Sequence, residues 1–393
     1  MHKIKAKLKK IIALTMLFII FLSNNIYAEQ DINNFDIDAK AGFLIEPSSK
    51  KILYQKNPHE KLPPASITKI MTILLIYEAI ENKKINLDDL VNISEHAANM
   101  GGSQIFLEPN EQQTVRDLLK AIIIASANDA AVAMAEYISG SEESFVNLMN
   151  QKAKYLNMND TNFCNACGLD VDGHLTSAHD IAIMSCELIN KYPEVLNTTK
   201  IWMDNIKHKT RKGEKLFGLS NTNRLIKTYP GATGLKTGST SKALFCISAS
   251  AHKNDMNLIA VILGAENPKK RFGEAAKLLD YGFMNYQIIK CEPAGTIKAK
   301  IKVYKGEEDQ VNIAIKNQVS SVIKKNKNQD KITSEIKVKH EINAPVRKNS
   351  KVGEIIYFIN QKEIGKSDLV VTRDIKKASL SKIINKLLNR WLT

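Results

Sequence analysis

Apolar and polar residues follow different patterns in the two parts of the chain. Up to about residue 285, long apolar segments recur with helical spacing, at 67–81, 118–125, 130–138 and 181–190. From about residue 286 onwards, short runs alternate apolar and polar residues, as β-strands with one buried face do. The pattern therefore predicts a mixed α/β domain followed by a small all-β domain.

Two pairs of apolar runs in the first part predict β-hairpins. The runs 43–45 and 52–55 flank a polar turn, and the runs 244–251 and 258–263 flank another at 253–255. The second pair is almost wholly apolar, so we expect it to be central. The predicted fold class is α/β (α+β), with a central antiparallel sheet flanked by helices, a small all-β C-terminal domain and a terminal amphipathic helix.

The two ends of the chain have patterns of their own. Five lysines precede or flank the start of an apolar run at 11–22, which is typical of a secretory signal, and we assign residues 1–28 to it. In residues 373–393 apolar residues form one helical stripe and basic residues take other positions, which predicts an amphipathic helix at a membrane surface. An uncleaved N-terminal anchor and a tail packed on the β domain are the alternatives. The two domains between these ends are placed at 29–285 and 286–372.

The composition is that of a globular protein with excess basic charge. Of 393 residues, 44% are hydrophobic and 25% are charged, and the net charge is +15. This charge suits nucleic acid or an anionic membrane or cell wall, but the basic-aromatic motifs of common nucleic-acid modules are missing, so we expect no nucleic-acid partner. The five cysteines are expected to be mainly buried free thiols, with a Cys164–Cys167 bridge as the alternative.

The first candidate for chemistry is Ser66, at the start of the apolar segment 67–81. Pro63 and Pro64 precede it, and proline suits the approach to a helix rather than its interior. Lys69 lies one turn later on the same face, and burial would favour the neutral form of its amine. A serine beside a neutral lysine is a candidate nucleophile with its own base. Ser-x-x-Lys occurs six more times in the chain, but only this copy opens a long apolar helix.

Two further motifs follow along the chain. Ser126 and Asn128 lie in a turn between two apolar helices, where buried hydroxyl and amide groups need hydrogen-bond partners. Lys236-Thr237-Gly238 occurs once, on the predicted strand before the central hairpin. A glycine in a strand favours close approach by another backbone or by a ligand.

In this order, the Ser-x-x-Lys, Ser-Ala-Asn and Lys-Thr-Gly motifs resemble those of the serine penicillin-binding enzymes. Four segments narrow the resemblance to the low-molecular-mass D-alanyl-D-alanine carboxypeptidases of the peptidase S11 family: Gly101-Gly102-Ser103, Ser126-Ala127-Asn128-Asp129-Ala130-Ala131, Gly168-Leu169-Asp170 and Thr176-Ser177-Ala178-His179-Asp180. The resemblance covers nearly the whole chain after the signal. It implies a penicillin-binding or β-lactamase-like catalytic fold for residues 29–285.

The resemblance also implies a mechanism. Ser66 attacks the carbonyl between the two terminal D-alanines of a peptidoglycan muropeptide, and it binds penicillin and other β-lactams covalently. Lys69 is the implied base for acylation. Backbone N–H groups of Ser66 and Ser239 form the implied oxyanion hole, while Ser126 and Asn128 relay protons and hold the substrate amide. No cofactor or metal is implied.

By the same resemblance, the substrate-binding strand contains Lys236, Thr237, Gly238 and Ser239. Lys236 supplies positive charge and Thr237 a hydroxyl for the terminal carboxylate of the substrate. Arg224 lies in an Asn-Arg-Leu segment that is similar to the one carrying the family's carboxylate-binding arginine. A surface arginine is the alternative for Arg224.

The chain departs from the family's pattern at three positions. Thr233 stands where aspartate is frequent before the Lys-Thr-Gly strand, and Ala243-Leu244 stands where a smaller pair is usual. Ala127 occupies a position where glycine is also common. None of these departures removes a residue to which the resemblance gives a catalytic role. With threonine in place of aspartate at 233, the sequence does not show which side chains support the start of the Lys-Thr-Gly strand.

Three other functions compete with the carboxypeptidase. A class A β-lactamase needs a deacylating glutamate, and the segment that begins at Glu194 is one residue short of the required motif. A metallopeptidase would use the cluster of Asp172, His174, His179 and Asp180, which lacks a helical His-Glu-x-x-His motif. A non-catalytic wall-binding protein would keep the fold without the chemistry. We expect an exported enzyme, peripheral to the periplasmic face of the bacterial inner membrane.

Overall fold

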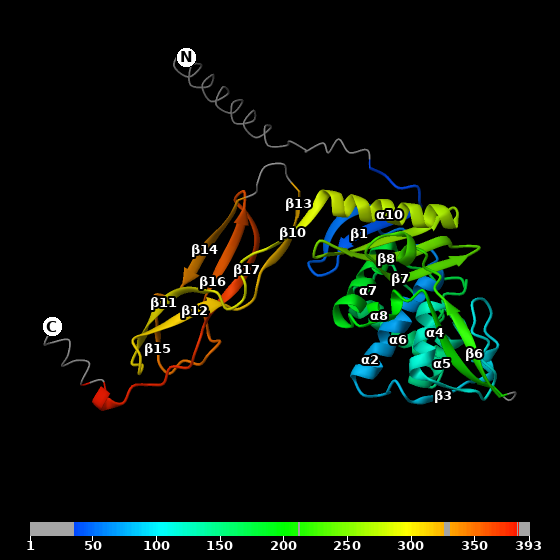
Figure 1. Ribbon diagram of the computed structural model, residues 1–393, viewed down its shortest axis with the longest axis horizontal. Helices are drawn as coiled ribbons and strands as arrows, with labels where there is room; N and C mark the ends of the chain where they lie inside the picture. Colours follow the sequence, from blue (N-terminus) through cyan, green and yellow to red (C-terminus); the bar gives the residue numbers. More distant parts are fainter. Residues whose placement is uncertain (1–34, 211–212, 326–330, 383, 385–393) are drawn as a thin grey trace, which may run out of the picture. The chain divides into compact units, whose positions relative to one another are not determined.

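The computed structural model describes residues 35–382 and 384, except for 211–212 and 326–330 (Figure 1). The predicted signal at 1–28 lies outside the described residues, as does most of the predicted terminal helix. Among the described residues, no helix is long and apolar enough to cross a membrane.

A five-stranded antiparallel sheet forms the centre of the first domain. Its strand order is β2-β1-β9-β8-β7. The bounds are β1 Ala41–Glu46, β2 Lys51–Lys56, β7 Ala232–Thr240, β8 Leu244–Lys253 and β9 Met256–Ala265. Both predicted hairpins are confirmed, since β1 pairs with β2 and β8 with β9. The Lys-Thr-Gly strand, β7, lies at one edge of this sheet.

Helices cover both faces of the sheet. The long helix α10 packs on β8 and β9 from one side, and α7 packs on β1 and β9 from the other (Figure 1). The central strands are buried on both faces for this reason, which explains their nearly continuous apolar sequence.

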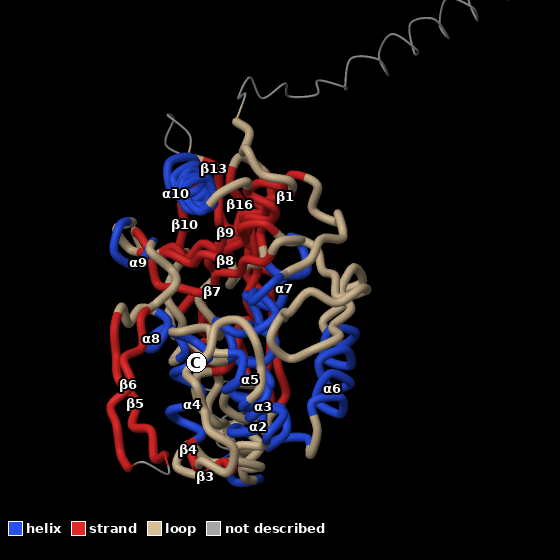
Figure 2. The backbone as a smooth tube through the Cα atoms, turned by 90° about the vertical axis from the view of Figure 1, so that its right-hand side faces the viewer, coloured by secondary structure: helices blue, strands red, loops and turns tan. Residues whose placement is uncertain are grey.

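Helices α2 to α6 lie on the same side of the sheet as α7 (Figure 2). The Ser-x-x-Lys motif ends at the start of α2, and the Ser-Ala-Asn motif ends at the start of α5. The described helices are α2 Lys69–Glu81, α3 Glu95–Ala98, α4 Val115–Ile124, α5 Asn128–Ser139, α6 Glu142–Tyr155, α7 Ala178–Lys191, α8 Val195–Thr199, α9 Leu225–Thr228 and α10 Pro268–Asn285. Helix α2 is buried along ten of its residues, from Lys69 to Ala79. It runs through the core between α4, α5 and α7, so the apolar segment that defines it packs on all sides.

Helix ends follow the capping residues in the sequence. Thr114 caps α4, as its spacing to Asp117 predicts, and its side chain accepts the N–H of Asp117. Asn267 caps α10 in the same way and Pro268 takes the first helical position. The sequence analysis did not identify α10 despite this start signal, nor α6 and the hairpin of β5 (Met203–Thr210) and β6 (Gly213–Ser220).

The chain after α10 is built from β-strands, as the alternating pattern predicts. A six-stranded sheet has the order β14-β16-β17-β12-β11-β15, and a separate pair joins β10 to β13. The bounds are β10 Tyr286–Lys290, β11 Ile297–Tyr304, β12 Gln310–Ile315, β13 Ser320–Lys324, β14 Ile332–Val338, β15 Glu341–Asn343, β16 Lys351–Ile359 and β17 Lys362–Val371. Its own apolar core includes Val303, Ile313, Ile355 and Leu369, each at most 5% exposed.

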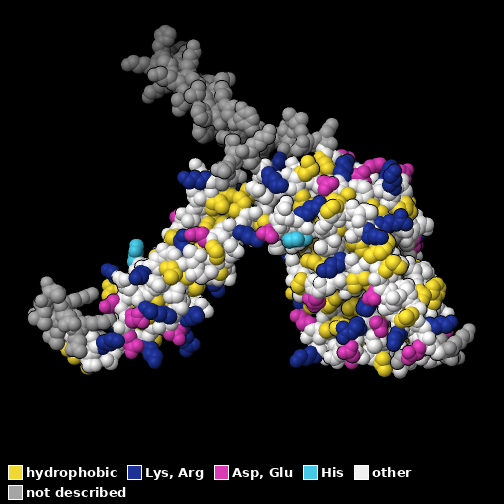
Figure 3. Space-filling model, viewed as in Figure 1, with side chains coloured by type: hydrophobic (Ala, Val, Ile, Leu, Met, Phe, Trp, Pro, Cys, Tyr) yellow, Lys and Arg dark blue, Asp and Glu magenta, His cyan; other side chains and the backbone are white. Residues whose placement is uncertain are grey.

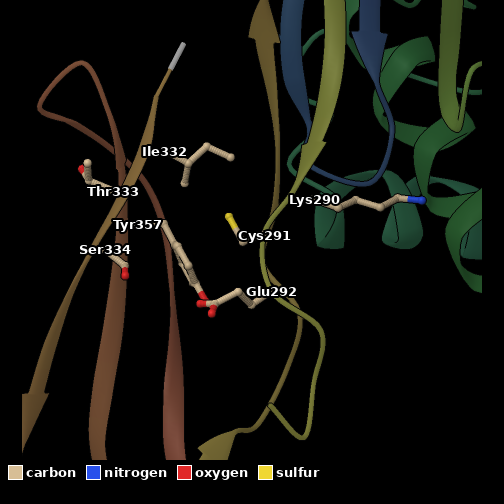
Figure 4. Close-up of a pocket in the computed structure, with 7 residues that line it drawn as sticks. All are labelled: Lys290, Cys291, Glu292, Ile332, Thr333, Ser334 and Tyr357. Carbon is tan, nitrogen blue, oxygen red and sulfur yellow. The ribbon is translucent and has the colours of Figure 1, made fainter. Parts of the chain in front are cut away.

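A cavity of about 380 Å³ opens in the β-rich part (Figure 4). It is lined by Lys290, Cys291, Glu292, Ile332, Thr333, Ser334 and Tyr357. The Tyr357 hydroxyl donates to Glu292, which also accepts from Lys298, so the polar groups at its base are already paired.

The segment after β17 stays with the β-rich part for several residues. Ile375 is 2% exposed and forms an isolated bridge with Val346, and Lys377 forms another with Gly306. Helical residues begin at Leu380. The described start of the terminal helix therefore lies seven residues after the predicted boundary at 373.

The five cysteines are free thiols, and all except Cys164 are buried. Burial raises the pKa of the Cys186 thiol to about 12. Basic and acidic side chains are interspersed on the face shown in Figure 3. Excess charge is thus spread over the surface in that view.

Candidate active site

Ser66 lies in a tight turn at the start of the buried helix. The turn is a single 3-10 segment, Ala65–Thr68, which runs directly into α2. The sequence predicts that Ser66 opens the helix, and in the structure Ser66 lies in the 3-10 turn that directly precedes α2. Ala65 has φ of +47°, an unusual conformation for a residue with a side chain, which turns the chain sharply before the serine.

Lys69 is the nearest polar group to the serine. Its Nζ lies 3.0 Å from Ser66 Oγ, 2.6 Å from Asn128 Oδ1 and 2.7 Å from the carbonyl oxygen of Cys167. The side chain is completely buried. Burial lowers the pKa of Lys69 to about 8, although Cys167 and Asp129 partly oppose the shift. At neutral pH a minor but significant fraction of the Lys69 amines, about one tenth at pH 7, is therefore neutral.

Ser126 and Asn128 face Lys69 from the turn between α4 and α5. Ser126 has φ of +63° and is 3% exposed, and Asn128 begins α5. The Asn128 amide donates to the Gly101 carbonyl, and its backbone N–H donates to Ser103. These two hydrogen bonds hold Asn128 so that its amide oxygen accepts a hydrogen bond from Lys69.

Lys236 reaches the same site from the edge strand β7. Its Nζ lies 2.8 Å from Ser126 Oγ and 3.0 Å from the carbonyl oxygen of Thr237. Burial lowers its pKa well below the ordinary value, and the nearby Lys69 and Arg271 lower it further. Two buried lysines therefore lie close enough for their charges to interact, Lys69 with its amine on Ser66 and Lys236 with its amine on Ser126.

Gly238 allows β7 to lie against the serine turn. A Cβ at this position would lie 2.9 Å from both the Pro64 carbonyl oxygen and the Ser66 nitrogen. The close approach predicted for this glycine is thus present, and its partner is the backbone of the turn that carries Ser66. Beside it, Thr237 is buried and its hydroxyl lies 2.7 Å from that of Thr222, while Ser239 is exposed at the rim.

Arg224 is exposed at the start of α9. The structure therefore places it at the outer edge of the site rather than beside the lysines. A second arginine, Arg271 of α10, lies behind β7 and donates to the Gly238 carbonyl oxygen over 3.2 Å. Burial and the neighbouring Arg224 lower the pKa of Arg271 to about 10. The sequence analysis missed Arg271 because it missed α10.

The loop around residue 165 closes the opposite side of the serine turn. The Asn165 side-chain oxygen accepts backbone N–H groups from Cys167, Gly168 and Leu169. This directs the Cys167 carbonyl at Lys69. Gly168 has φ of +90°, and a Cβ there would lie 1.9 Å from the Ala65 carbonyl oxygen. The Gly-Leu-Asp segment thus packs directly on the nucleophile turn.

Thr233 is held within the sheet. Its hydroxyl lies 2.7 Å from that of Ser250 on β8, and its carbonyl oxygen accepts the Thr199 hydroxyl. These two contacts support the start of β7 where the family often has an aspartate.

The residues that the competing functions would use have other partners, and one of them, His174, contacts the serine turn itself through Thr68. Glu194 is exposed at the start of α8. His174 contacts Thr68 and the Cys164 N–H, whereas His179 lies 2.9 Å from Asp180. Among the described residues, no group of three His, Cys, Asp or Glu side chains is placed to hold a metal ion.

Comparison with known proteins agrees with this geometry. Residues 26–267 match the family model described as D-alanyl-D-alanine carboxypeptidase, peptidase S11, and residues 286–377 match the C-terminal domain of penicillin-binding protein 5. The chain belongs to the S11 family of D-alanyl-D-alanine carboxypeptidases. The predicted family, fold class and enzyme activity are thereby confirmed.

Individual S11 relatives cover most of the chain. The carboxypeptidase DacF of Bacillus subtilis is 44% identical over 90% of this chain and 90% of its own length. DacC of Escherichia coli is 34% identical over 89% and 87% of the two chains. The crystal structure of penicillin-binding protein 5 from Haemophilus influenzae is 31% identical, with a TM-score of 0.73 over 88% of this chain and all of that chain.

Proposed function

We propose that Ser66 is the nucleophile of this carboxypeptidase and that its substrate is the D-alanyl-D-alanine end of peptidoglycan stem peptides. The observation that supports the proposal is the buried Lys69 amine, whose pKa is lowered by burial and which lies 3.0 Å from Ser66 Oγ. A neutral amine at that distance can take the hydroxyl proton as the oxygen attacks. The new ester bond links Ser66 to the penultimate D-alanine, and the terminal D-alanine leaves as the amine.

Proton delivery to the leaving amine is assigned to Ser126. Its hydroxyl accepts a hydrogen bond from Lys236 Nζ over 2.8 Å, and Ser126 lies two residues before Asn128 in the turn between α4 and α5. In the second half of the reaction, water attacks the ester and its proton passes to the same basic groups. Asn128 holds Lys69 in position through its amide oxygen and presents a polar group to the substrate amide.

The oxyanion hole is assigned to the N–H groups of Ser66 and Ser239. The close approach of Gly238 to the Ser66 nitrogen brings the two backbone segments together at one point. One such donor typically contributes about 3 kcal/mol to transition-state stabilisation. The tetrahedral oxygen would therefore be bound by one donor from each segment.

We assign the binding of the substrate's terminal carboxylate to side chains of β7 and to arginines near that strand. Lys236 supplies positive charge within the site, Arg271 adds positive charge from behind β7, Thr237 supplies a hydroxyl, and Arg224 completes the recognition from the rim. Charge-assisted hydrogen bonds contribute about 1.5–3 kcal/mol. Arg224→Ala should therefore lower kcat/KM about tenfold to a hundredfold for a peptide acid and change little for the peptide amide. Equal discrimination by both proteins would remove Arg224 from this role.

The nucleophile assignment is tested with a fluorescent penicillin and a diacetyl-Lys-D-Ala-D-Ala peptide. We expect one covalent label per chain, located by mass spectrometry on the peptide that contains Ser66, and release of D-alanine from the substrate. Ser66→Ala should abolish both. A label that survives Ser66→Ala, or a labelled protein that releases no D-alanine, would contradict the proposal. The solved Listeria monocytogenes penicillin-binding protein D2 in its ampicillin-bound form, 32% identical over 64% of this chain with a TM-score of 0.54, supports the choice of probe.

We also propose that the enzyme is exported by the signal at 1–28 and held at the outer leaflet of the cytoplasmic membrane by its terminal helix. The support is the apolar stripe and the basic residues after Leu380. Because Ile375 is buried in the β-rich part, the truncation must begin at residue 380. Deletion of 380–393 should release an active enzyme from anionic liposomes. Unchanged liposome binding by the truncated protein in low salt would assign attachment to the general basic charge instead.

A further inference from the structure

His174 lies on the far side of the nucleophile turn from the substrate-binding strand, and the mechanism above does not use it. The imidazole is 3% exposed, in the loop that also carries Gly168. Its Nδ1 accepts the backbone N–H of Cys164 over 2.9 Å, and its Nε2 lies 2.8 Å from the Thr68 hydroxyl oxygen. Both ring nitrogens therefore have a partner.

These partners fix where the protons lie. Because Nδ1 accepts a hydrogen bond, the proton of the neutral ring is on Nε2, which donates to Thr68. Burial lowers the pKa of His174 to about 4, so the ring is neutral at physiological pH. The Thr68 hydroxyl in turn donates to the carbonyl oxygen of Ala65 over 2.8 Å. The hydrogen bonds thus run in one direction, from His174 through Thr68 to Ala65.

The end of this chain is the peptide group that joins Ala65 to Ser66. In a planar trans peptide the carbonyl oxygen and the N–H point to opposite sides, so holding one directs the other. The N–H of this peptide belongs to Ser66 and is the assigned oxyanion donor. Ala65 needs such support, because its φ of +47° costs roughly 1–2 kcal/mol for a residue with a side chain.

We propose that His174 is a positioning residue which acts through Thr68 to orient and polarise the Ala65–Ser66 peptide, and so aims the Ser66 N–H at the developing oxyanion. This inference rests on the function proposed above and extends it to two residues that the three motifs do not specify, His174 and Thr68. Hydrogen bonds in series polarise one another, so a donor at the Ala65 carbonyl strengthens the N–H of the same peptide as a donor.

The imidazole is not needed to attach its loop to the rest of the domain. Leu62 and Thr176 exchange backbone hydrogen bonds in both directions, and the Thr72 hydroxyl donates to the Ala166 carbonyl over 2.6 Å. Gly168 also packs on the Ala65 carbonyl. Loss of the His174 hydrogen bonds should therefore leave the loop in place and alter the orientation of one peptide group.

The first test compares Thr68→Val with Thr68→Ser. Valine keeps the volume and removes the hydroxyl, whereas serine keeps the hydroxyl. Acylation by a fluorescent penicillin should be measured over a range of concentrations, which separates the binding constant from the first-order acylation rate. We expect Thr68→Val to lower the rate about tenfold to a hundredfold with little change in binding, because a small misplacement of a catalytic group has costs of that order. Thr68→Ser should acylate within about threefold of wild type.

The second test compares His174→Phe with His174→Gln. Phenylalanine keeps an aromatic ring beside Phe163, whose ring centroid lies 5.9 Å from that of His174, but it removes both hydrogen bonds. Glutamine keeps a donor for Thr68. We expect His174→Phe to resemble Thr68→Val, His174→Gln to recover most of the rate, and the double variant His174→Phe with Thr68→Val to be no worse than either single variant.

Melting temperatures of all variants should be recorded so that rates are compared where each protein is folded. A Thr68→Val enzyme that acylates at the wild-type rate overturns the proposal. The proposal is also overturned if the rate losses of the two single variants multiply in the double variant, or if Thr68→Val weakens penicillin binding without lowering the acylation rate. If His174→Phe does not fold, the Thr68 pair decides. Failure of the proposed function is a different result, in which wild-type protein forms no adduct at Ser66.

Discussion

If Lys69 is the base, the acylation rate should rise with pH through the pKa of its amine. Burial lowers that pKa to about 8. With this value, about one tenth of the enzyme has a neutral Lys69 at pH 7 and about nine tenths at pH 9. The second-order rate constant for acylation should therefore increase roughly tenfold over this interval. In energetic terms, deprotonation at pH 7 costs about 1.4 kcal/mol of the activation barrier.

The assay is stopped-flow labelling with a fluorescent penicillin between pH 6 and pH 10, since a β-lactam acylates without a D-alanine leaving group. Lys69→Arg should abolish the reaction across the range, because a guanidinium stays protonated. A wild-type rate that is constant or that falls between pH 7 and pH 9 would refute the assignment of Lys69 as the titrating base.

Lys236 provides the control, because it is also a buried lysine with a lowered pKa and it contacts Ser126. Lys236→Gln removes its amine and leaves Lys69 beside Ser66. If Lys69 is the base, this variant should be slower but should keep a rising pH limb. Loss of the limb in Lys236→Gln would show that Lys236 is the group whose deprotonation is observed.

Three further predictions concern the residues that support the site. Gly168→Ala should reduce the acylation rate at least tenfold. The backbone of residue 168 has a φ of +90°, which alanine rarely adopts, and its Cβ would lie 1.9 Å from the Ala65 carbonyl oxygen, so the turn that carries Ser66 would have to move. Labelling kinetics measure the rate, and a wild-type value would contradict the prediction. The pKa of His174 is about 4 in the folded protein against an ordinary 6.5, so between pH 6.5 and pH 4 the unfolded chain binds more protons than the folded protein. The free energy of unfolding, measured by denaturant titration, should therefore fall by up to about 3 kcal/mol as the pH drops through this interval. His174→Gln should remove this pH-dependent contribution. Asp129→Asn should lower the free energy of unfolding by about 1–3 kcal/mol. The buried Asp129 carboxylate accepts the N–H groups of Ile105, Leu107 and Ala130, and an amide would replace one acceptor oxygen with a donor. Urea unfolding at pH 7 measures this change, and unchanged stability would refute the prediction.

The main elements were predictable where the local pattern decides them. Helix α2 and the β8–β9 hairpin are long apolar segments that must be buried wherever they lie, and Thr114 begins its helix because its side chain caps a neighbouring N–H. Helix α10 was missed because its apolar face, which includes Leu278 and Leu279, is interrupted by lysines and glycines. Only its Asn-Pro start marked it.

The order and types of the proposed catalytic residues are also readable from the sequence. Short motifs single out Ser66, Lys69, Ser126, Asn128 and Lys236. The fold brings Lys69 within hydrogen-bond distance of Ser66 and Asn128, and Lys236 within hydrogen-bond distance of Ser126. Spacing alone explains only the Ser66–Lys69 pair, which lies within one helical turn. The other contacts join positions 59 and 110 residues apart, and tertiary packing decides them.

What the sequence by itself determined is the set of reactive groups, the helix that carries the nucleophile and the change from α/β to all-β structure near residue 286. The tertiary structure decided the environment of those groups. The pKa of Lys69 depends on burial, and Arg271 reaches the Lys-Thr-Gly strand from a helix that begins 28 residues after the strand ends. The link from His174 to Ala65 likewise joins a loop and a turn 109 residues apart. Burial and hydrogen bonding at a site depend on segments that no local pattern specifies, because they arise only when distant parts of the chain pack together.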